Sequence, residues 1–179
     1  MIVLYKGSRG KGKTLTMVKD GYQYHKEGFK VISNFKTSFS KQLDNDAIMS
    51  LNKESNLSNC ILLIDEIQIF FDSRQGMRKQ NITFSNFIQQ IRKRNITILC
   101  TTQFSNTVDL RLRQHLDIIA FPNFISKLKV CEVTYFDLTR LEDNLLIQDN
   151  GETLKPRTIK LVYNPDSIFK MYNTSEMII

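Results

Sequence analysis

The sequence contains no run of eighteen apolar residues, so it predicts no membrane-spanning helix. It also lacks a basic amino-terminal segment with a cleavage site, because apolar residues begin at once with Ile2, Val3 and Leu4, and we predict no signal peptide. No internal repeat, low-complexity tract or linker divides the 179 residues, a length that suits one domain with its own core.

Cysteine is scarce, and the three cysteines lack the spacing of metal ligands. Cys60, Cys100 and Cys131 each lie in an apolar, strand-like run, which indicates buried free thiols in a reducing compartment.

Acidic residues are absent from one long stretch, between Asp72 and Asp109. The formal net charge is +7, from 25 Lys and Arg against 18 Asp and Glu. The basic residues that concentrate in this stretch are Arg74, Arg78, Lys79, Arg92, Lys93 and Arg94. A solvated basic face would account for them. The alternative is a surface that contacts phosphates, because clustered cations release counterions from nucleic acid on binding.

Short apolar runs alternate with helical patterns through the first two thirds of the chain, which predicts an α/β fold with a parallel sheet. The predicted strands are residues 2–5, 30–35, 60–65, 96–102 and 116–121. A helix is predicted from Leu15 to a stop at Gly28, and a more polar helix over 38–52. A third helical stripe, which we assign to the core, consists of Phe84, Phe87, Ile88 and Ile91.

The pattern changes after Pro122. Residues 127–138 form a long β-like run, and the runs 145–148 and 158–163 flank Asn150-Gly151, a pair typical of hairpin turns. We therefore predict a single domain of 1–179, with a core of 1–121 and an antiparallel annex and C-terminal segment over 122–179.

The chain contains a full match to the phosphate-loop pattern G-x-x-x-x-G-K-[ST], between a predicted strand and a predicted helix. Its residues are Gly7, Ser8, Arg9, Gly10, Lys11, Gly12, Lys13 and Thr14. Such a loop directs backbone N–H groups at the β-phosphate, and the helix N-terminus adds its dipole. Lys13 is expected to bridge the β- and γ-phosphates of ATP, and the Thr14 hydroxyl to ligate Mg²⁺.

A second motif ends the apolar strand 60–65 with Asp65 and Glu66. Asp65 is expected to hold Mg²⁺ through water, and Glu66 to polarise the attacking water. Because a kinase excludes a water-activating base, Glu66 favours ATP hydrolysis over phosphate transfer to an acceptor. Gln103, at the end of the strand 96–102, is a candidate to reach the γ-phosphate or that water.

Cations directly before the strand 96–102 are candidates for an arginine finger, a side chain that stabilises charge in a neighbouring subunit's site. Arg92 and Arg94 lie there, and Arg111 and Arg113 are rivals on a later segment. The helix dipole alone would also favour cations at a helix end.

Together these residues resemble the FtsK–HerA superfamily of ring-forming DNA-pumping ATPases. Within it, the sequence resembles the small genome-packaging ATPases of membrane-containing and archaeal viruses, and zonula occludens toxin-like assembly ATPases of filamentous phages are similar too. The resemblance covers residues 1–121 and is carried by segments 7–14, 31–34 and 62–66, with Arg92 and 102–103. Residues 171–176 resemble a Tyr-Asp-Thr-x-Glu element, with Asn173 in place of Asp.

The resemblance implies a RecA-like P-loop fold with strand order 5-1-4-3-2, which places the Gln103 strand between those leading to Lys13 and Asp65. In the family an arginine eleven positions before the strand-end Gln often serves as the finger, which selects Arg92. The resemblance also implies a hexameric ring with ATP at subunit interfaces and double-stranded DNA in the pore. Residues 73–81 are then a candidate pore loop, in which Arg74, Arg78 and Lys79 would contact phosphates and not bases.

The leading hypothesis is therefore an ATP-driven translocase that packages viral double-stranded DNA, located in the host cytoplasm and the virion, with a capsid or membrane protein at the portal vertex as a further partner. Toxin-like members carry a membrane segment after the ATPase core, and its absence from this sequence favours packaging over filament extrusion. A second hypothesis is an ATPase that moves protein during virion assembly or secretion. A small-molecule kinase is the third, against which Glu66 and the absence of an Arg-rich lid argue.

Overall fold

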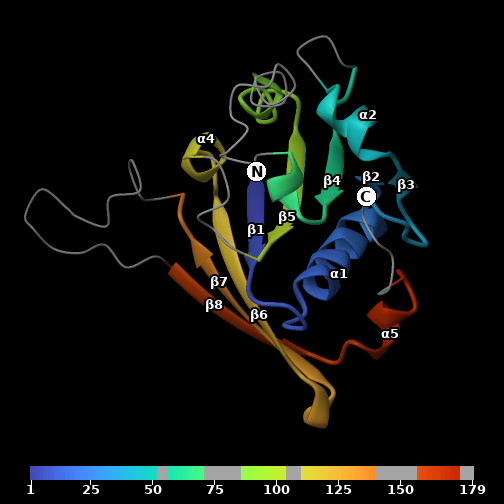
Figure 1. The fold of residues 1–179 in the computed structure, drawn as a ribbon, viewed down its shortest axis with the longest axis vertical. Helices are drawn as coiled ribbons and strands as arrows, with labels where there is room; N and C mark the ends of the chain where they lie inside the picture. The colour runs from blue at the N-terminus through green and yellow to red at the C-terminus, as the bar shows by residue number, and fades with distance from the viewer. Residues whose placement is uncertain (52–55, 71–85, 104–109, 140–156, 174–179) are drawn as a thin grey trace, which may run out of the picture.

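A single twisted sheet forms the centre of the fold in the computed structural model, which describes residues 1–51, 56–70, 86–103, 110–139 and 157–173 (Figure 1). The strand order is β3-β2-β4-β5-β1-β6-β7-β8. The strands are β1 (Ile2–Lys6), β2 (Lys30–Ser33), β3 (Lys41–Gln42), β4 (Cys60–Ile64), β5 (Ile96–Thr102), β6 (Ile118–Ile125), β7 (Val130–Asp137) and β8 (Arg157–Tyr163). The pairs from β3 to β6 are parallel, and β7 and β8 are added antiparallel.

The predicted strand order is confirmed for the five predicted parallel strands, which lie as β6-β1-β5-β4-β2. The sheet is larger than predicted, because β3 joins its β2 edge. The antiparallel annex extends the same sheet beyond β6. The fold class, an α/β P-loop fold with an antiparallel annex, is therefore confirmed.

The change of sequence pattern after Pro122 predicted that the fifth strand ends before this residue. That prediction is wrong, because this strand, β6, continues through Pro122 to Ile125. β1 pairs with β6 only as far as Ala120, and two residues after Pro122 the Phe124 N–H donates to Lys11 O, 3.1 Å away. Residues 122 and 124 point their nitrogens to the same side of the strand, away from β7. The missing proline N–H therefore costs no hydrogen bond of the β6–β7 ladder.

The helices differ from the prediction mainly in length. Within the described residues they are α1 (Lys13–Lys26), α2 (Asn45–Met49), α4 (Leu110–Gln114) and α5 (Asp166–Phe169), with short 3-10 helices η1 (Ile67–Ile69) and η4 (Ser126–Leu128). α1 is as predicted, but the polar helix over 38–52 is wrong in extent, because β3 and α2 share that segment. Asp44 sets the start of α2, since its Oδ1 accepts the Ala47 N–H at 2.7 Å. Phe84 and the Asn150-Gly151 turn lie outside the described residues.

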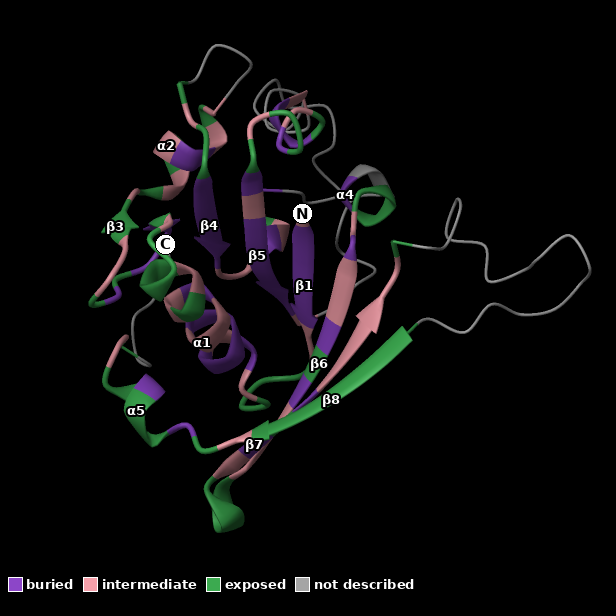
Figure 2. Cartoon of the chain, turned by 180° about the vertical axis from the view of Figure 1, so that it is seen from behind, coloured by how far each residue is buried: buried purple, intermediate pink, exposed green. Residues whose placement is uncertain are grey.

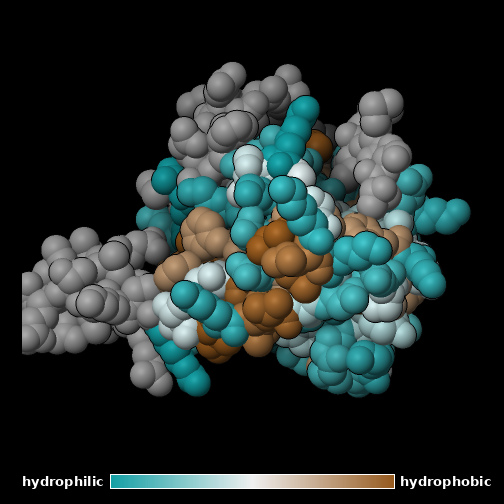
Figure 3. All heavy atoms as spheres, turned by 90° about the horizontal axis from the view of Figure 1, so that it is seen from below, coloured by the Kyte–Doolittle hydropathy of each residue, from teal (hydrophilic) through white to brown (hydrophobic). Residues whose placement is uncertain are grey.

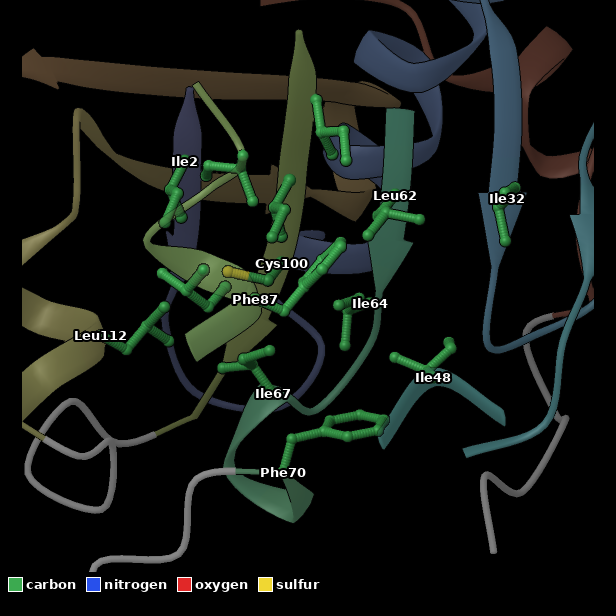
Figure 4. Packing of buried hydrophobic residues seen from close by; sticks show 14 of the residues in the cluster. Ile2, Ile32, Ile48, Leu62, Ile64, Ile67, Phe70, Phe87, Cys100 and Leu112 are labelled. Carbon is green, nitrogen blue, oxygen red and sulfur yellow. The ribbon is translucent and has the colours of Figure 1, made fainter. Parts of the chain in front are cut away.

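Successive side chains of the central strands point to opposite faces of the sheet. They form two separate apolar clusters, one on each face. Ile2 and Leu4 of β1 face one cluster, together with η1 and the Phe87 segment (Figure 4). Val3 and Tyr5 face the other cluster, which α1 covers. Phe87, Ile88 and Ile91 are buried, as predicted. None of the helices in the described ranges is long and apolar enough to cross a bilayer.

The annex differs from the rest of the sheet in its exposure. β8 forms the outer edge and is exposed along nearly its whole length (Figure 2). Large apolar side chains exposed on β6, η4, β8 and α5 are Phe121, Leu128, Ile159, Leu161, Val162 and Phe169. Figure 3 looks from below and shows apolar surface surrounded by hydrophilic side chains.

Candidate active site

The phosphate loop joins β1 to α1 and takes a backbone path that its glycines permit. Gly10 and Gly12 have φ of +73° and +84°, in the left-handed region that side chains disfavour. A Cβ at Gly12 would lie only 3.2 Å from Cys131 Sγ and 3.3 Å from Phe124 Cβ, so the annex packs directly against the loop. Gly12 is therefore required both by its dihedral angles and by this close contact.

Lys13, the first residue of α1, is 7% exposed, and its Nζ donates to Ser8 O across the loop at 3.2 Å. Burial lowers the pKa of Lys13, whereas the carboxylates of Glu66 and Asp65 act to raise it. The other loop side chains, Ser8, Arg9 and Lys11, are exposed. Lys11 Nζ donates to Asn123 Oδ1 at 2.9 Å, a second link between the loop and β6.

Asp65 and Gln103 come together because β4 and β5 are parallel neighbours. Ile64 lies opposite Cys100 in the register, so the residues after each strand meet at the same edge, where β1 also ends. In α/β sheets, ligands bind in the crevice outside the carboxyl ends of the strands. The structure therefore places the predicted residues Lys13, Thr14, Asp65, Glu66 and Gln103 at one such edge.

Two threonine hydroxyls contact the Asp65 carboxylate. Thr14 Oγ1 donates to it, with 3.0 Å to Oδ1 and 3.1 Å to Oδ2, and Thr101 Oγ1 donates to Oδ1. Burial raises the pKa of Asp65, while the hydrogen bonds from Thr101 and Thr14 oppose that shift. Thr101 also accepts the Glu66 N–H at 2.9 Å, so one buried side chain fixes both acidic residues.

Glu66 follows β4 with a left-handed backbone (φ +56°, ψ +57°) and starts η1. Its carboxylate is held by two amides: Gln103 Nε2 donates to Oε1 at 3.0 Å, and Gln68 Nε2 donates to Oε2. Gln103 therefore lies beside Glu66, and its expected reach to the γ-phosphate or the attacking water stays a prediction.

Three further residues of the site received no role from the sequence alone. Asn34, at the end of β2, accepts the Asp65 N–H at 2.8 Å and donates to Asp65 O at 3.1 Å. Thr101 and Gln68 are the other two. The polar pair 101–102 at the end of an apolar strand, and a glutamine two residues after Glu66, were the signals available for these two.

A magnesium ion fits the residues present, because Thr14 Oγ1 and the Asp65 carboxylate oxygens lie within 3.1 Å of one another. Hydroxyl and carboxylate oxygens are the ligands that Mg²⁺ prefers, usually with several waters.

The structure does not bring Arg92 to this edge. Its guanidinium Nη2 lies 2.7 Å from Asp117 Oδ1, and Asp117 also accepts the Ile2 N–H at 2.7 Å. Arg92 precedes β5, Asp117 precedes β6 and Ile2 begins β1, so Arg92 lies at the amino edge of the sheet. β5 spans seven residues, which separates Arg92 from the phosphate-loop edge by about 20 Å. Its side chain is 77% exposed.

The other candidates for the arginine finger are Arg94, Arg111 and Arg113. Arg94 lies two residues before the start of β5, and its backbone oxygen accepts the Asn59 N–H at 2.9 Å. Arg111 and Arg113 belong to α4, and Arg113 is exposed. The DNA-contact candidates Arg74, Arg78 and Lys79 lie outside the described residues.

Comparisons with known proteins agree with this fold. A family model described as "Zonular occludens toxin (Zot)" matches residues 1–176, and no curated protein sequence matches the chain. The N-terminal domain of zonular occludens toxin from Neisseria meningitidis is similar in structure, with a TM-score of 0.60 and 19% identity, over 96% of this chain and 98% of that chain. The genome packaging NTPase of Sulfolobus turreted icosahedral virus 2, in complex with ATP-gammaS, is similar with a TM-score of 0.57 and 14% identity, over 79% of this chain and 93% of that chain. At these identities the two likenesses show the fold.

Proposed function

This chain belongs to the zonular occludens toxin family, and from that premise we propose that it is an ATPase that drives a step in phage or virion assembly. The observation that carries the proposal is the convergence of five predicted residues at the carboxyl edge of the sheet. They are Lys13, Thr14, Asp65, Glu66 and Gln103.

The position of each of these residues suits it to one role in ATP hydrolysis. The loop N–H groups and Lys13 would bind the phosphates of ATP. Thr14 and Asp65 would hold Mg²⁺, which would neutralise charge on the phosphate oxygens. Glu66 accepts a proton from the attacking water, and Gln103 orients the Glu66 carboxylate or the water itself. Thr101 keeps Asp65 and Glu66 in register with each other.

The position of Arg92 supports a site that is completed by a neighbouring subunit. Because Arg92 lies about 20 Å from its own phosphate loop, it has no role in its own site. In a head-to-tail ring, which we propose to be a hexamer, one subunit's amino edge meets the next subunit's phosphate loop. The exposed Arg92 then stabilises the charge that develops on the neighbour's ATP.

What the hydrolysis moves is the finer part of the proposal. The net charge of +7 and the acid-free stretch 73–108 support translocation of double-stranded DNA, as in packaging of a viral genome. A specific observation favours the alternative, a protein-moving assembly ATPase. The toxin-family match extends through the annex to residue 176, whereas the likeness to the packaging NTPase covers 79% of the chain.

Steady-state ATP turnover with and without duplex DNA at low salt tests this proposal. A DNA translocase is stimulated by DNA, and Arg78→Ala with Lys79→Ala removes that stimulation without changing basal turnover. Lys26→Ala with Lys30→Ala, which removes the same charge at exposed positions at the end of α1 and the start of β2, is the matched control and keeps the stimulation.

ATP turnover that is the same with and without DNA would contradict DNA translocation. The protein-moving assembly ATPase would then be the better proposal, and we would expect binding to a coat or membrane protein. Glu66→Gln checks the chemistry itself. It should lower turnover by about 10²-fold or more while ATP still binds. No turnover by the wild type under any of these conditions would contradict the ATPase proposal.

A further inference from the structure

Both carboxylate oxygens of Glu66 are engaged by amide side chains from different elements. Gln103, at the end of β5, donates to Oε1 at 3.0 Å, and Gln68, on η1, donates to Oε2. A glutamate side chain has three rotatable torsions, and the left-handed backbone at Glu66 does not by itself select one rotamer. The two amides together fix where the carboxylate points.

Gln68 is itself held rigidly by its neighbours. Ile67 and Phe70 are 0% exposed and belong to the same apolar cluster as Phe87 (Figure 4). η1 is also closed by the Phe70 N–H, which donates to Ile67 O at 3.0 Å. The amide of Gln68 therefore approaches Glu66 from an anchored element.

The other amide atom of Gln68 carries a cost. Gln68 Oε1 is buried and has no hydrogen-bond partner in the part of the chain that the structure describes. A buried acceptor without a donor costs about 1–3 kcal/mol, and a methionine of similar length would avoid that cost. A buried acceptor without a partner among the described residues, two residues from the proposed water-activating base, points to a role in function and not in folding.

We propose that Gln68 is a positioning residue for Glu66: it holds Oε2 so that the carboxylate faces the attacking water. The inference rests on the proposed function, in which Glu66 activates that water. A base must lie within hydrogen-bond reach of the proton it takes, and small misplacements of catalytic groups lower rates steeply. Gln68 acts on the chemical step and not on ATP binding, because its described contact is with Glu66 and not with the phosphate loop.

Gln68→Met in the full chain tests the proposal through three readouts. We expect kcat to fall about tenfold to a hundredfold, with KM for ATP within about twofold of the wild type. The melting temperature should be unchanged or higher, because methionine removes a buried acceptor that has no partner among the described residues. Gln23→Met is the matched control. It removes a similar amide–carboxylate pair, with Glu27 on the exposed face of α1, and should leave turnover unchanged.

A second variant and a double variant complete the test. Gln68→Leu should repeat the loss of kcat. Gln68→Met combined with Gln103→Met should cost less than the sum of the single changes, because both amides act on one carboxylate.

An unchanged kcat in Gln68→Met would overturn the proposal. So would a raised kcat, which would make Gln68 a brake on Glu66, and so would a loss of kcat accompanied by a lower melting temperature and a higher KM. The proposed function fails separately, if Glu66→Gln retains wild-type turnover. If Glu66→Gln is inactive and Gln68→Met is not impaired, only the positioning role is wrong.

Discussion

Thr101 forms hydrogen bonds with both acidic residues of the site, with the Asp65 carboxylate and with the Glu66 backbone. It is fully buried on β5, donates to Asp65 Oδ1 and accepts the Glu66 N–H. Its register position opposite the end of β4 makes both contacts possible. The Thr101 side chain therefore couples the geometry of the proposed metal ligand to that of the proposed base.

Thr101→Val keeps the shape of the side chain and removes both hydrogen bonds. We expect the free energy of unfolding, measured by urea denaturation, to fall by about 1–3 kcal/mol because the Glu66 N–H loses its acceptor. Turnover should fall as well, since Asp65 loses the Thr101 hydroxyl donor. Thr97→Val, on the same strand but partly exposed, should change stability by less than about 0.5 kcal/mol. Equal effects of the two substitutions would contradict the role of Thr101.

Sequence motifs predicted the residues whose chemistry is local to one segment. The phosphate loop, Asp65, Glu66 and Gln103 each follow from a strand and the residues at its end. Asn34, Thr101 and Gln68 could not be assigned roles in this way, because their contacts depend on the register between β2, β4 and β5 and on the path of η1. Arg92 was selected by spacing, but its ion pair with Asp117 depends on how β5 and β6 lie on either side of β1.

At the scale of elements, tyrosines join the annex to β1 and α1. Tyr5 of β1 and Tyr135 of β7 both donate to Asp20 Oδ2 on α1, at 2.7 and 2.9 Å. Tyr163 of β8 pairs with Thr16, whose hydroxyl lies 2.9 Å from Gly12 O of the phosphate loop. The annex therefore contacts the nucleotide loop through α1 as well as directly, and a change in the loop has a physical route to the exposed β8 edge.

The element boundaries were harder to predict than the elements. β3 lies within a segment with a helical polar pattern, because pairing with the edge of β2 outweighs local periodicity there. β6 continues past Pro122 because that residue's nitrogen faces away from the β7 ladder.

The buried side chains of Tyr5 and Tyr135 predict a loss of stability at high pH. Burial raises the pKa of Tyr5 well above its ordinary value of 10.0, and burial with the Asp20 carboxylate does the same for Tyr135. Because the folded-state pKa is raised, the unfolded chain releases these protons first. The stability they contribute is complete below pH 10 and is lost as the pH rises above it, by about 1.4 kcal/mol per pH unit for each phenol.

Urea denaturation at a series of pH values from about 8 to 11 measures this loss, and Tyr135→Phe should make it shallower by one phenol's share. Ultraviolet absorbance gives the ionisation of the phenols in the folded protein. If Tyr5 and Tyr135 ionised near pH 10 with the fold intact, the buried contacts with Asp20 would be contradicted.

At the scale of the whole molecule, the carboxyl and amino edges of the parallel sheet have different roles in the proposed mechanism. The carboxyl edge carries the phosphate loop, Asp65, Glu66 and Gln103, whereas the amino edge carries Arg92, fixed by Asp117. Asp117 is buried and accepts a hydrogen bond from the start of β1. Its ion pair therefore holds the exposed Arg92 guanidinium in a defined position. In the proposed mechanism such a subunit carries one half of a site at each end, and a neighbouring subunit completes it.

Mixing Arg92→Ala subunits with Lys13→Ala subunits tests this central claim most directly. Each variant alone should be inactive, the first with ATP binding retained and the second without it. In a one-to-one random mixture, about a quarter of head-to-tail interfaces pair an intact Lys13 with a neighbour's intact Arg92, and ATP turnover should return in proportion. If both variants fold and assemble like the wild type and the mixture remains inactive, Arg92 does not act across the interface and the account of a shared site is wrong.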